Sequence, residues 1–452
     1  MSPQPAVESS GVGPILKRVV SNAGKLLGGR AINAVLGLGA MALAARALGV
    51  RDLGVLVLIQ AFGQFLAEVV EFQSWQTVLQ YGAGPLADGR REDFQRVLRF
   101  SVVLDAASAA LGVTLGSIGA FLLAGRLGWS GGDAPGAALY MLSLVFMVSA
   151  TPLGLLRLFD RFDVMARQAA LISLIRLIGC GVAYGLGSGV NGFLLAWAIG
   201  AVGSWLYLAG SAFGELRRRD LLQGFRWRGP LAHEMPGVWR FAWNTNLASA
   251  LDVALTHLAT LFIGALIGPA QAAFWRVGRQ VADAVAKPAR LLTPALFPEL
   301  ARLRADGRSS DMWRLSRDVG LLAGGIGVLL LGITAVAGPA LLSLVMGQAF
   351  APAAEVMTWQ VGAAVLGIAA LPLEPLLVSL GKPGAAAVVR LSVGAAFLSS
   401  LPFLVRHFGL IGAGAGLTAA TGALALGMLW LILREARIRR AAVAPETDTK
   451  TV

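Results

Sequence analysis

The sequence is divided into about twelve apolar runs, separated by short stretches that hold charges, glycine and proline. A bilayer core about 30 Å thick needs roughly 20 residues of helix to cross it. Because 56% of the 452 residues are hydrophobic and only 14% are charged, lipid must be the solvent of most of the surface. The sequence therefore predicts an all-α polytopic membrane protein. The predicted helices span residues 24–48, 53–79, 100–124, 136–158, 168–187, 191–213, 240–264, 272–297, 318–342, 353–380, 385–405 and 411–433.

Lysine and arginine are unevenly distributed among the predicted loops. Most of the 38 basic residues fall on the side of both termini, whereas only Arg46, Arg51, Arg126 and Arg406 fall on the other side. Cytoplasmic loops are enriched in basic residues, so we expect a multi-pass protein of a bacterial inner membrane with both termini in the cytoplasm. The net charge of +13 is scattered and forms no basic domain. It therefore indicates topology rather than a nucleic-acid partner.

An internal repeat relates the two halves of the chain. Gly49 within ALGVRDLGVL aligns with Gly268 within LIGPAQAAFW at an offset of 219, and the ADGR that ends at Arg90 recurs at Arg308 at an offset of 218. This indicates two parallel-duplicated six-helix lobes, an arrangement that in transporters encloses a substrate cavity. The expected organisation is a cytoplasmic segment 1–23, an N-lobe 24–213, a cytoplasmic inter-lobe loop 214–239, a C-lobe 240–433 and a cytoplasmic tail 434–452.

Charged side chains form a stripe on the predicted helix 272–297. An α-helix turns about 100° per residue, so the stripe falls within an arc of about 80°. A charge at the bilayer centre costs on the order of 2.5 to 3.5 kcal/mol, so such a stripe should face protein or water. In the alternative, structural interpretation, the first arginine reaches the membrane surface and the others neutralise the single acid. The stripe consists of Arg276, Arg279, Asp283, Lys287 and Arg290.

A second polar stripe lies on the predicted helix 53–79. The repeat places Glu68 over Lys287 and Glu71 over Arg290, with opposite signs at matching depth. These pairs would close the cytoplasmic side when the cavity opens outward. A protonated glutamate that couples transport to a proton or sodium gradient, or a purely structural pair, would fit the same pattern. The stripe consists of Gln60, Gln64, Glu68, Glu71 and Trp75.

A broader polar face occurs on the predicted helix 240–264. This face would bind sugar hydroxyls or water in a polar cavity, although polar contacts between packed helices are the commoner use of such residues in membranes. Asn33, related to Asp252 by the repeat, would belong to the same cavity. The polar face holds Asn246, Ser249, Asp252, Thr256 and Thr260.

Several short motifs occur in a specific order along nearly the whole chain. They are Ala45-Arg46-Ala47-Leu48-Gly49 with Leu53-Gly54 after it, Leu261-Phe262-Ile263-Gly264 leading to Gly268-Pro269, Phe297-Pro298-Glu299-Leu300-Ala301-Arg302-Leu303, Gly347-Gln348-Ala349-Phe350-Ala351-Pro352-Ala353, and Gly381-Lys382-Pro383. In these motifs the sequence resembles the O-antigen and exopolysaccharide repeat-unit flippases of the multidrug/oligosaccharidyl-lipid/polysaccharide exporter (MOP) superfamily. It departs from them at Ala259, where relatives often carry an aspartate.

The resemblance implies a transporter rather than an enzyme. Its substrate would be an undecaprenyl-pyrophosphate-linked oligosaccharide, moved from the cytoplasmic to the periplasmic face by alternating access for polysaccharide biosynthesis. No cofactor is implied, and a polysaccharide polymerase and export proteins are candidate partners. Arginine matches phosphate oxygens bidentately, so Arg30, Arg276 and Arg279 are the expected pyrophosphate contacts.

Two other functions compete with this one. A multidrug antiporter of the same superfamily would export cations, and its cavity should then carry net acid. A membrane-embedded polysaccharide polymerase should need a large extramembrane loop or a clustered acid and base, and the sequence predicts neither. His233, His257 and His407 are far apart and Cys180 is the single cysteine, so no dedicated metal site is expected.

Overall fold

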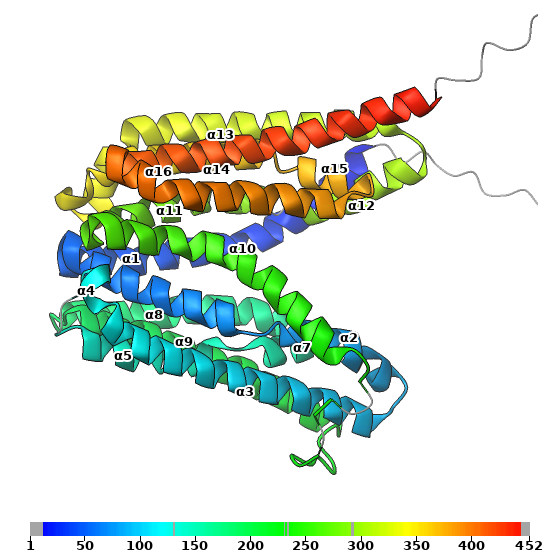
Figure 1. Ribbon diagram of the computed structural model, residues 1–452, viewed down its shortest axis with the longest axis horizontal. Helices are drawn as coiled ribbons and strands as arrows, with labels where there is room; N and C mark the ends of the chain where they lie inside the picture. Colours follow the sequence, from blue (N-terminus) through cyan, green and yellow to red (C-terminus); the bar gives the residue numbers. More distant parts are fainter. Residues whose placement is uncertain (1–11, 130–131, 230, 233–234, 291–292, 444–452) are drawn as a thin grey trace, which may run out of the picture.

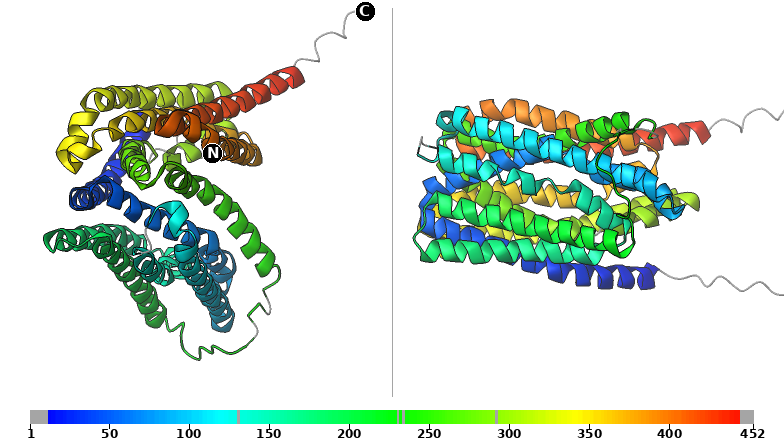
Figure 2. Two further views of the ribbon diagram at one scale, coloured as in Figure 1. Left: turned by 60° about the vertical axis from the view of Figure 1, so that its left-hand side comes forward. Right: turned by 90° about the horizontal axis from the view of Figure 1, so that it is seen from below.

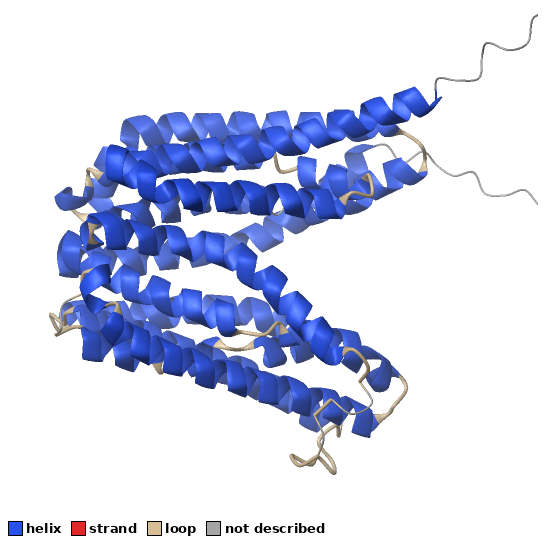
Figure 3. Ribbon diagram, in the orientation of Figure 1, coloured by secondary structure: helices blue, strands red, loops and turns tan. Residues whose placement is uncertain are grey.

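A computed structural model describes residues 12–129, 132–229, 231–232, 235–290 and 293–443. Within these ranges it leaves undescribed the side chains of residues 12–34, 247–256, 290, 293–295, 309, 383 and 438–443. Helices make up all the regular structure of the described residues (Figure 3). The helices are α1 Val12–Val70, α2 Ser74–Ala87, α3 Arg91–Leu122, α4 Ala124–Leu127, α5 Ala134–Met141, α6 Leu144–Met147, α7 Ala150–Leu158, α8 Phe162–Gly185, α9 Val190–Arg218, α10 Val238–Ile267, α11 Pro269–Arg290, α12 Thr293–Ala305, α13 Ser309–Met346, the 3₁₀ helix η1 Gln348–Phe350, α14 Ala353–Ala369, α15 Leu373–Ser379 and α16 Pro383–Val443.

Twelve membrane crossings follow from these helices. Eight segments are long and apolar enough to span a bilayer, and two of them, 53 and 54 residues long, each hold two crossings. Non-helical backbone at Gly49 divides α1, and Gly409 divides α16. The helix α10 and the consecutive helices α11 and α12 supply the remaining two crossings. The expected all-α polytopic membrane fold is confirmed.

The repeat is visible in the backbone conformation. Gly49 has φ 72° and ψ −174°, and Gly268 has φ 95° and ψ 169°. At the second pair of repeated motifs, φ is 69° at Gly89 and 71° at Gly307. Positive φ is readily adopted only by glycine, so both halves of the chain use glycine to make the same two reversals.

The two lobes meet at one end of the molecule and diverge at the other (Figures 1 and 2). We term the end that holds both described chain ends, Val12 and Val443, the terminus end, and the opposite end the far end. One large apolar core at the far end joins both lobes, with Phe62 and Trp129 from the N-lobe and Phe350 from the C-lobe. Separate cores fill each lobe toward the terminus end. Among the described residues, only the start of α10 packs across at that end, against α3, and the two lobes otherwise have cores of their own where they diverge.

Close backbone packing seals the far end. A Cβ added at Gly54 would lie 1.9 Å from the carbonyl oxygen of Pro269, so only glycine fits where α1 meets the start of α11. The Arg46 guanidinium donates hydrogen bonds to the carbonyl oxygens of Leu344 and Val345 at the end of α13. These contacts join the two lobes at the far end.

Helix α10 contacts both lobes. Near its start, Val238 and Ala242 pack with Phe100 of α3 in the N-lobe. Near its end, Ala259 packs with Trp275 and other C-lobe residues. Helix α10 therefore connects the two lobes, and the boundary at 239–240 stays a prediction from the sequence.

Three expected continuous helices are broken: one in the C-lobe, 353–380, is divided into α14 and α15, and two lie in the N-lobe. The predicted helix 53–79 is interrupted at residues 71–73, so Glu71 and Trp75 do not continue the stripe of Glu68 on one helix. The predicted helix 136–158 is divided into α5, α6 and α7. Side chains from other helices bond the backbone groups freed at the two N-lobe breaks, as buried backbone in a membrane requires.

Candidate functional site

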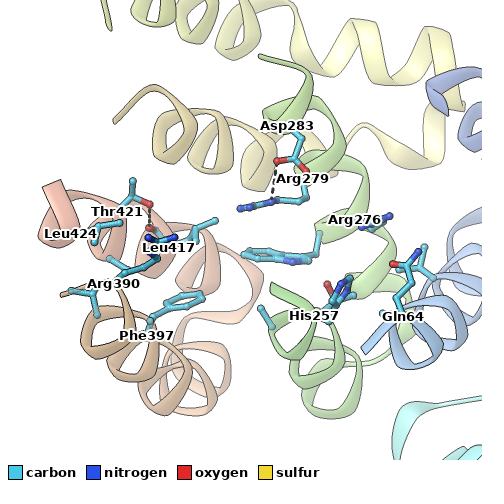
Figure 4. Close-up of a pocket in the computed structure, with 18 of the residues that line it drawn as sticks. Gln64, His257, Arg276, Arg279, Asp283, Arg390, Phe397, Leu417, Thr421 and Leu424 are labelled. Atoms are coloured by element: carbon cyan, nitrogen blue, oxygen red, sulfur yellow. Dashed lines mark hydrogen bonds and ion pairs between the residues drawn. The ribbon is translucent and has the colours of Figure 1, made fainter. Parts of the chain in front are cut away.

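A cavity of about 210 Å³ lies between the lobes. The part of α1 that follows Gly49 contributes one wall, and α10, α11 and α16 contribute the others. Its polar lining consists of Gln60, Gln64, His257, Thr260, Arg276, Arg279, Asp283, Arg390 and Thr421, and Trp275 and Phe397 supply aromatic surface (Figure 4). The structure thus brings the first part of the α11 stripe into the cavity, facing polar side chains from four helices.

Arg276 and Arg279 point to different sides of α11. Arg279 lies beside Asp283, with 3.6 Å between Nε and Oδ1, whereas Arg276 extends toward Gln64 of α1 (Figure 4). Among the described residues, no carboxylate lies within ion-pair distance of Arg276. Thus one arginine has an acid partner on its own helix, and the other approaches the N-lobe without one.

Arg390 is a cavity residue that we had not included among the candidate site residues. It lies within α16, lines the cavity, and donates a hydrogen bond of 2.6 Å to Glu374 Oε1. The predicted helix 385–405 contains Arg390, and α16, which begins at Pro383, places it two helical turns from its start. Three arginines and one carboxylate, Asp283, therefore line the cavity.

Glu68 is paired with His257 across the two lobes. The distance from His257 Nε2 to Glu68 Oε2 is 3.2 Å, while Lys287 is exposed. The lobes are apart at the terminus end, so the pairing of Glu68 with Lys287 is not formed in this conformation and stays a prediction for the opposite one. Sequence reasoning missed His257, although it precedes Thr260 of the polar face by three residues, a spacing that shares a helix face.

Glu71 and Asp105 stabilise the start of α7. Glu71 Oε1 accepts a hydrogen bond of 3.0 Å from the backbone N–H of Ser149, and Asp105 Oδ2 accepts one of 2.8 Å from that of Thr151. Asp105 also accepts a hydrogen bond from the Ser74 hydroxyl at the start of α2. Both carboxylates thus bond the backbone at the helix breaks. We had not identified Asp105, because its role depends on breaks that the apolar pattern does not reveal.

The remaining predicted residues fall into two groups. Asn246 Nδ2 donates a 3.0 Å hydrogen bond to the carbonyl oxygen of Glu71, so its side chain joins α10 to the N-lobe and does not line the cavity. Thr260 lines the cavity. The side chains of Arg30, Asn33, Ser249, Asp252, Thr256 and Arg290 lie outside the described residues.

Solved structures show the same fold. The chain aligns with an inward-facing multidrug resistance MATE family transporter of the MOP superfamily at a TM-score of 0.75 and 14% identity, over 91% of this chain and 96% of that one. It aligns with the lipid II flippase MurJ in an inward closed conformation at a TM-score of 0.71 and 12% identity, over 93% of each chain. At these identities the likeness shows the fold.

Sequence comparison gives a closer relationship. No family model matches the chain. The inner membrane protein YghQ of Escherichia coli (strain K12) is 34% identical over 346 residues, which cover 75% of this chain and 96% of YghQ. The chain therefore belongs to the family of YghQ, and it has the fold of MOP-superfamily transporters.

Proposed function

We propose that this protein transports an anionic lipid-linked oligosaccharide across a bacterial inner membrane by alternating access. The substrate class is a polyprenyl-pyrophosphate-linked glycan of polysaccharide biosynthesis. Likeness in fold to MurJ supports a lipid-linked substrate, and the relative YghQ supports the inner-membrane location.

The charge of the cavity is the observation that carries this proposal. Its lining holds Arg276, Arg279 and Arg390 against the single carboxylate of Asp283. A planar guanidinium donates two parallel hydrogen bonds to phosphate oxygens, and these bonds are stronger where water is partly excluded. A pyrophosphate would therefore be held by Arg276 and Arg279, and Arg30 remains a proposed third contact. The polar lining and the face of Trp275 are suited to the first sugars.

The arrangement of the lobes supports alternating access. The far end is sealed by the contact of Gly54 with Pro269, and the cavity lies where the lobes begin to diverge. With both termini in the cytoplasm, this conformation would receive substrate from the cytoplasmic side. Closure at the terminus end would bring Glu68 toward Lys287, the proposed gate, with Asp283 beside it. The pairing of Glu71 with Arg290 would require Glu71 to give up its bond to the N–H of Ser149.

Multidrug antiport is the second candidate function. The fold likeness to a MATE transporter favours it, as do Trp275 and Phe397, which give the cavity an aromatic surface. A cationic drug would meet an excess of arginine in this cavity, so the lining charge favours the anionic lipid. The two candidates differ in the sign of the transported charge.

Reconstituted vesicles test the proposed function. The purified protein is placed in liposomes that contain a fluorescent polyprenyl-pyrophosphate-linked oligosaccharide, and translocation is followed as the dye becomes protected from an impermeant quencher. We expect Arg279→Ala to lower the rate by on the order of tenfold or more, since a hydrogen bond to a charged group contributes about 1.5 to 3 kcal/mol.

Arg302→Ala is the matched control. Arg302 lies on α12 with 72% of its side chain exposed and a 3.9 Å contact to Glu299, so its loss should leave the rate unchanged. Equal rates for wild type and Arg279→Ala would contradict the proposal.

A further inference from the structure

Arg176 is a half-buried cation of the N-lobe that the cavity description does not include. It lies on α8, nine residues before the end of that helix at Gly185, at a depth of roughly 14 Å from the far end. Its Nε is inaccessible to solvent and has no hydrogen-bond partner. The described part of the chain places no carboxylate within ion-pair distance of it. A buried charge without a partner is costly, so this side chain calls for an acceptor that the described residues do not supply.

Arg176 and Arg276 approach a common region from opposite lobes. Arg276 lies seven residues after the start of α11, at roughly 11 Å from the far end, so the depths agree. Helix α1 packs against both α8 and α11. Each arginine interacts electrostatically with Tyr140 of α5, and Arg176 also interacts with Arg276. Two like charges therefore lie near one buried tyrosine, and Asp283 offsets the charge of Arg276 but not that of Arg176.

Gln60 adds a third donor to this region. It is 4% exposed, lines the cavity with Arg276, and its Nε2 has no hydrogen-bond partner. One helical turn later, an added Cβ at Gly63 would lie 3.2 Å from Cε1 of Tyr140, so α1 packs closely on that ring. Donors from α1, α8 and α11 thus lie in the region of Tyr140, and the described residues supply no acceptor for Gln60 Nε2 or Arg176 Nε.

We propose that Arg176, Arg276 and Gln60 form an anion subsite between the lobes, in which Arg176 is the N-lobe contact for a phosphate of the substrate. The inference rests on the proposed function for the identity of its ligand. An anion with several acceptor oxygens would satisfy these donors, and a phosphate provides them. Because the two arginines belong to different lobes, a diphosphate satisfies both, whereas a monophosphate satisfies one. Diphosphate binding therefore connects the two lobes.

Binding of three soluble probes tests this subsite. The full-length protein in detergent is titrated with farnesyl diphosphate, farnesyl monophosphate and farnesol. We expect wild type to prefer the diphosphate over the monophosphate by about tenfold, the equivalent of one further charge-assisted contact. Arg176→Met keeps the length of the side chain and removes its charge. It should reduce that preference to about twofold or less and leave monophosphate affinity nearly unchanged.

Two further variants make the result specific. Arg167→Ala removes an arginine from the same helix whose side chain is 66% exposed and paired with Asp163, and it should keep the wild-type preference. Arg176→Lys retains the charge and should keep most of the preference for the diphosphate. This variant also tests the subsite if Arg176→Met does not fold. A wild-type preference that persists in Arg176→Met overturns the subsite alone. If wild type binds neither phosphate better than farnesol, the proposed function fails as well.

Discussion

Two carboxylates of the N-lobe and two arginines differ in whether other residues of the protein bond them. Asp105 and Glu71 accept hydrogen bonds from backbone N–H groups and a hydroxyl at the helix breaks. Arg276 and the Nε of Arg176 have no hydrogen-bond partner among the described residues. Both sets lie within membrane-spanning segments, where unpaired charges are costly. The difference supports the proposal that Glu71 and Asp105 stabilise the fold, whereas Arg276 and Arg176 bind a ligand.

This contrast explains why a charge inside a membrane helix does not by itself indicate function. Glu71 appeared in the sequence as a gate or coupling residue, on the same grounds as Arg276. The distinguishing property is the set of partners, which depends on tertiary structure. The predictions below test whether the two sets differ as their partners suggest.

The largest effect on stability is expected at Asp105. Asp105→Ala leaves the Thr151 N–H and the Ser74 hydroxyl without their acceptor, so the free energy of unfolding should fall by about 2 to 3 kcal/mol. Thermal unfolding in detergent measures the change. Ser101→Ala is the control, since Ser101 precedes Asp105 by one turn of α3 and its buried hydroxyl has no partner. Equal losses of unfolding free energy in Asp105→Ala and Ser101→Ala would contradict the structural role of Asp105.

Arg276 should show the opposite pattern. Arg276→Met removes an unpaired charge and keeps most of the side-chain volume, so we expect stability to stay the same or rise by about 1 kcal/mol. Transport in vesicles should nevertheless fall on the order of tenfold. The same two assays, unfolding and translocation, report both effects. A variant that loses stability but keeps transport would place Arg276 with the structural carboxylates.

The pair of Glu68 and His257 should have a smaller effect. Its side chains are 43% and 13% exposed, so solvent screens part of the interaction. A double-mutant cycle of Glu68→Gln and His257→Ala should give a coupling free energy of about 0.5 to 1 kcal/mol in unfolding measurements. Coupling near zero would show that the contact across the lobes adds nothing to this conformation.

The apolar pattern predicted the fold more fully than the site. Runs of twenty apolar residues and the repeated glycines Gly49 and Gly268 depend on local sequence, and the helices and reversals follow from them. The break at residues 71–73 contains neither glycine nor proline. It depends on distant acceptors such as Ser108, whose Oγ lies 3.5 Å from the N–H of Phe72. Local sequence holds no signal for such partners.

Within the site, residues on a single helix were easier to identify than partners on different helices. Arg276 and Arg279 were identified because their spacing aligns them on one face. His257 was missed because its acid, Glu68, lies on another helix of the other lobe. Arg390 was not identified because it is the single charged residue of the predicted helix 385–405, so no stripe marked a face.

The charge of the transported molecule tests the central claim most directly. One preparation of proteoliposomes is given the fluorescent pyrophosphate-linked oligosaccharide and, in a parallel sample, a cationic dye under proton and sodium gradients. The account predicts that the wild-type protein moves the anionic lipid and leaves the dye where it was added. Dye export without lipid translocation would contradict the account and identify the protein as a multidrug antiporter.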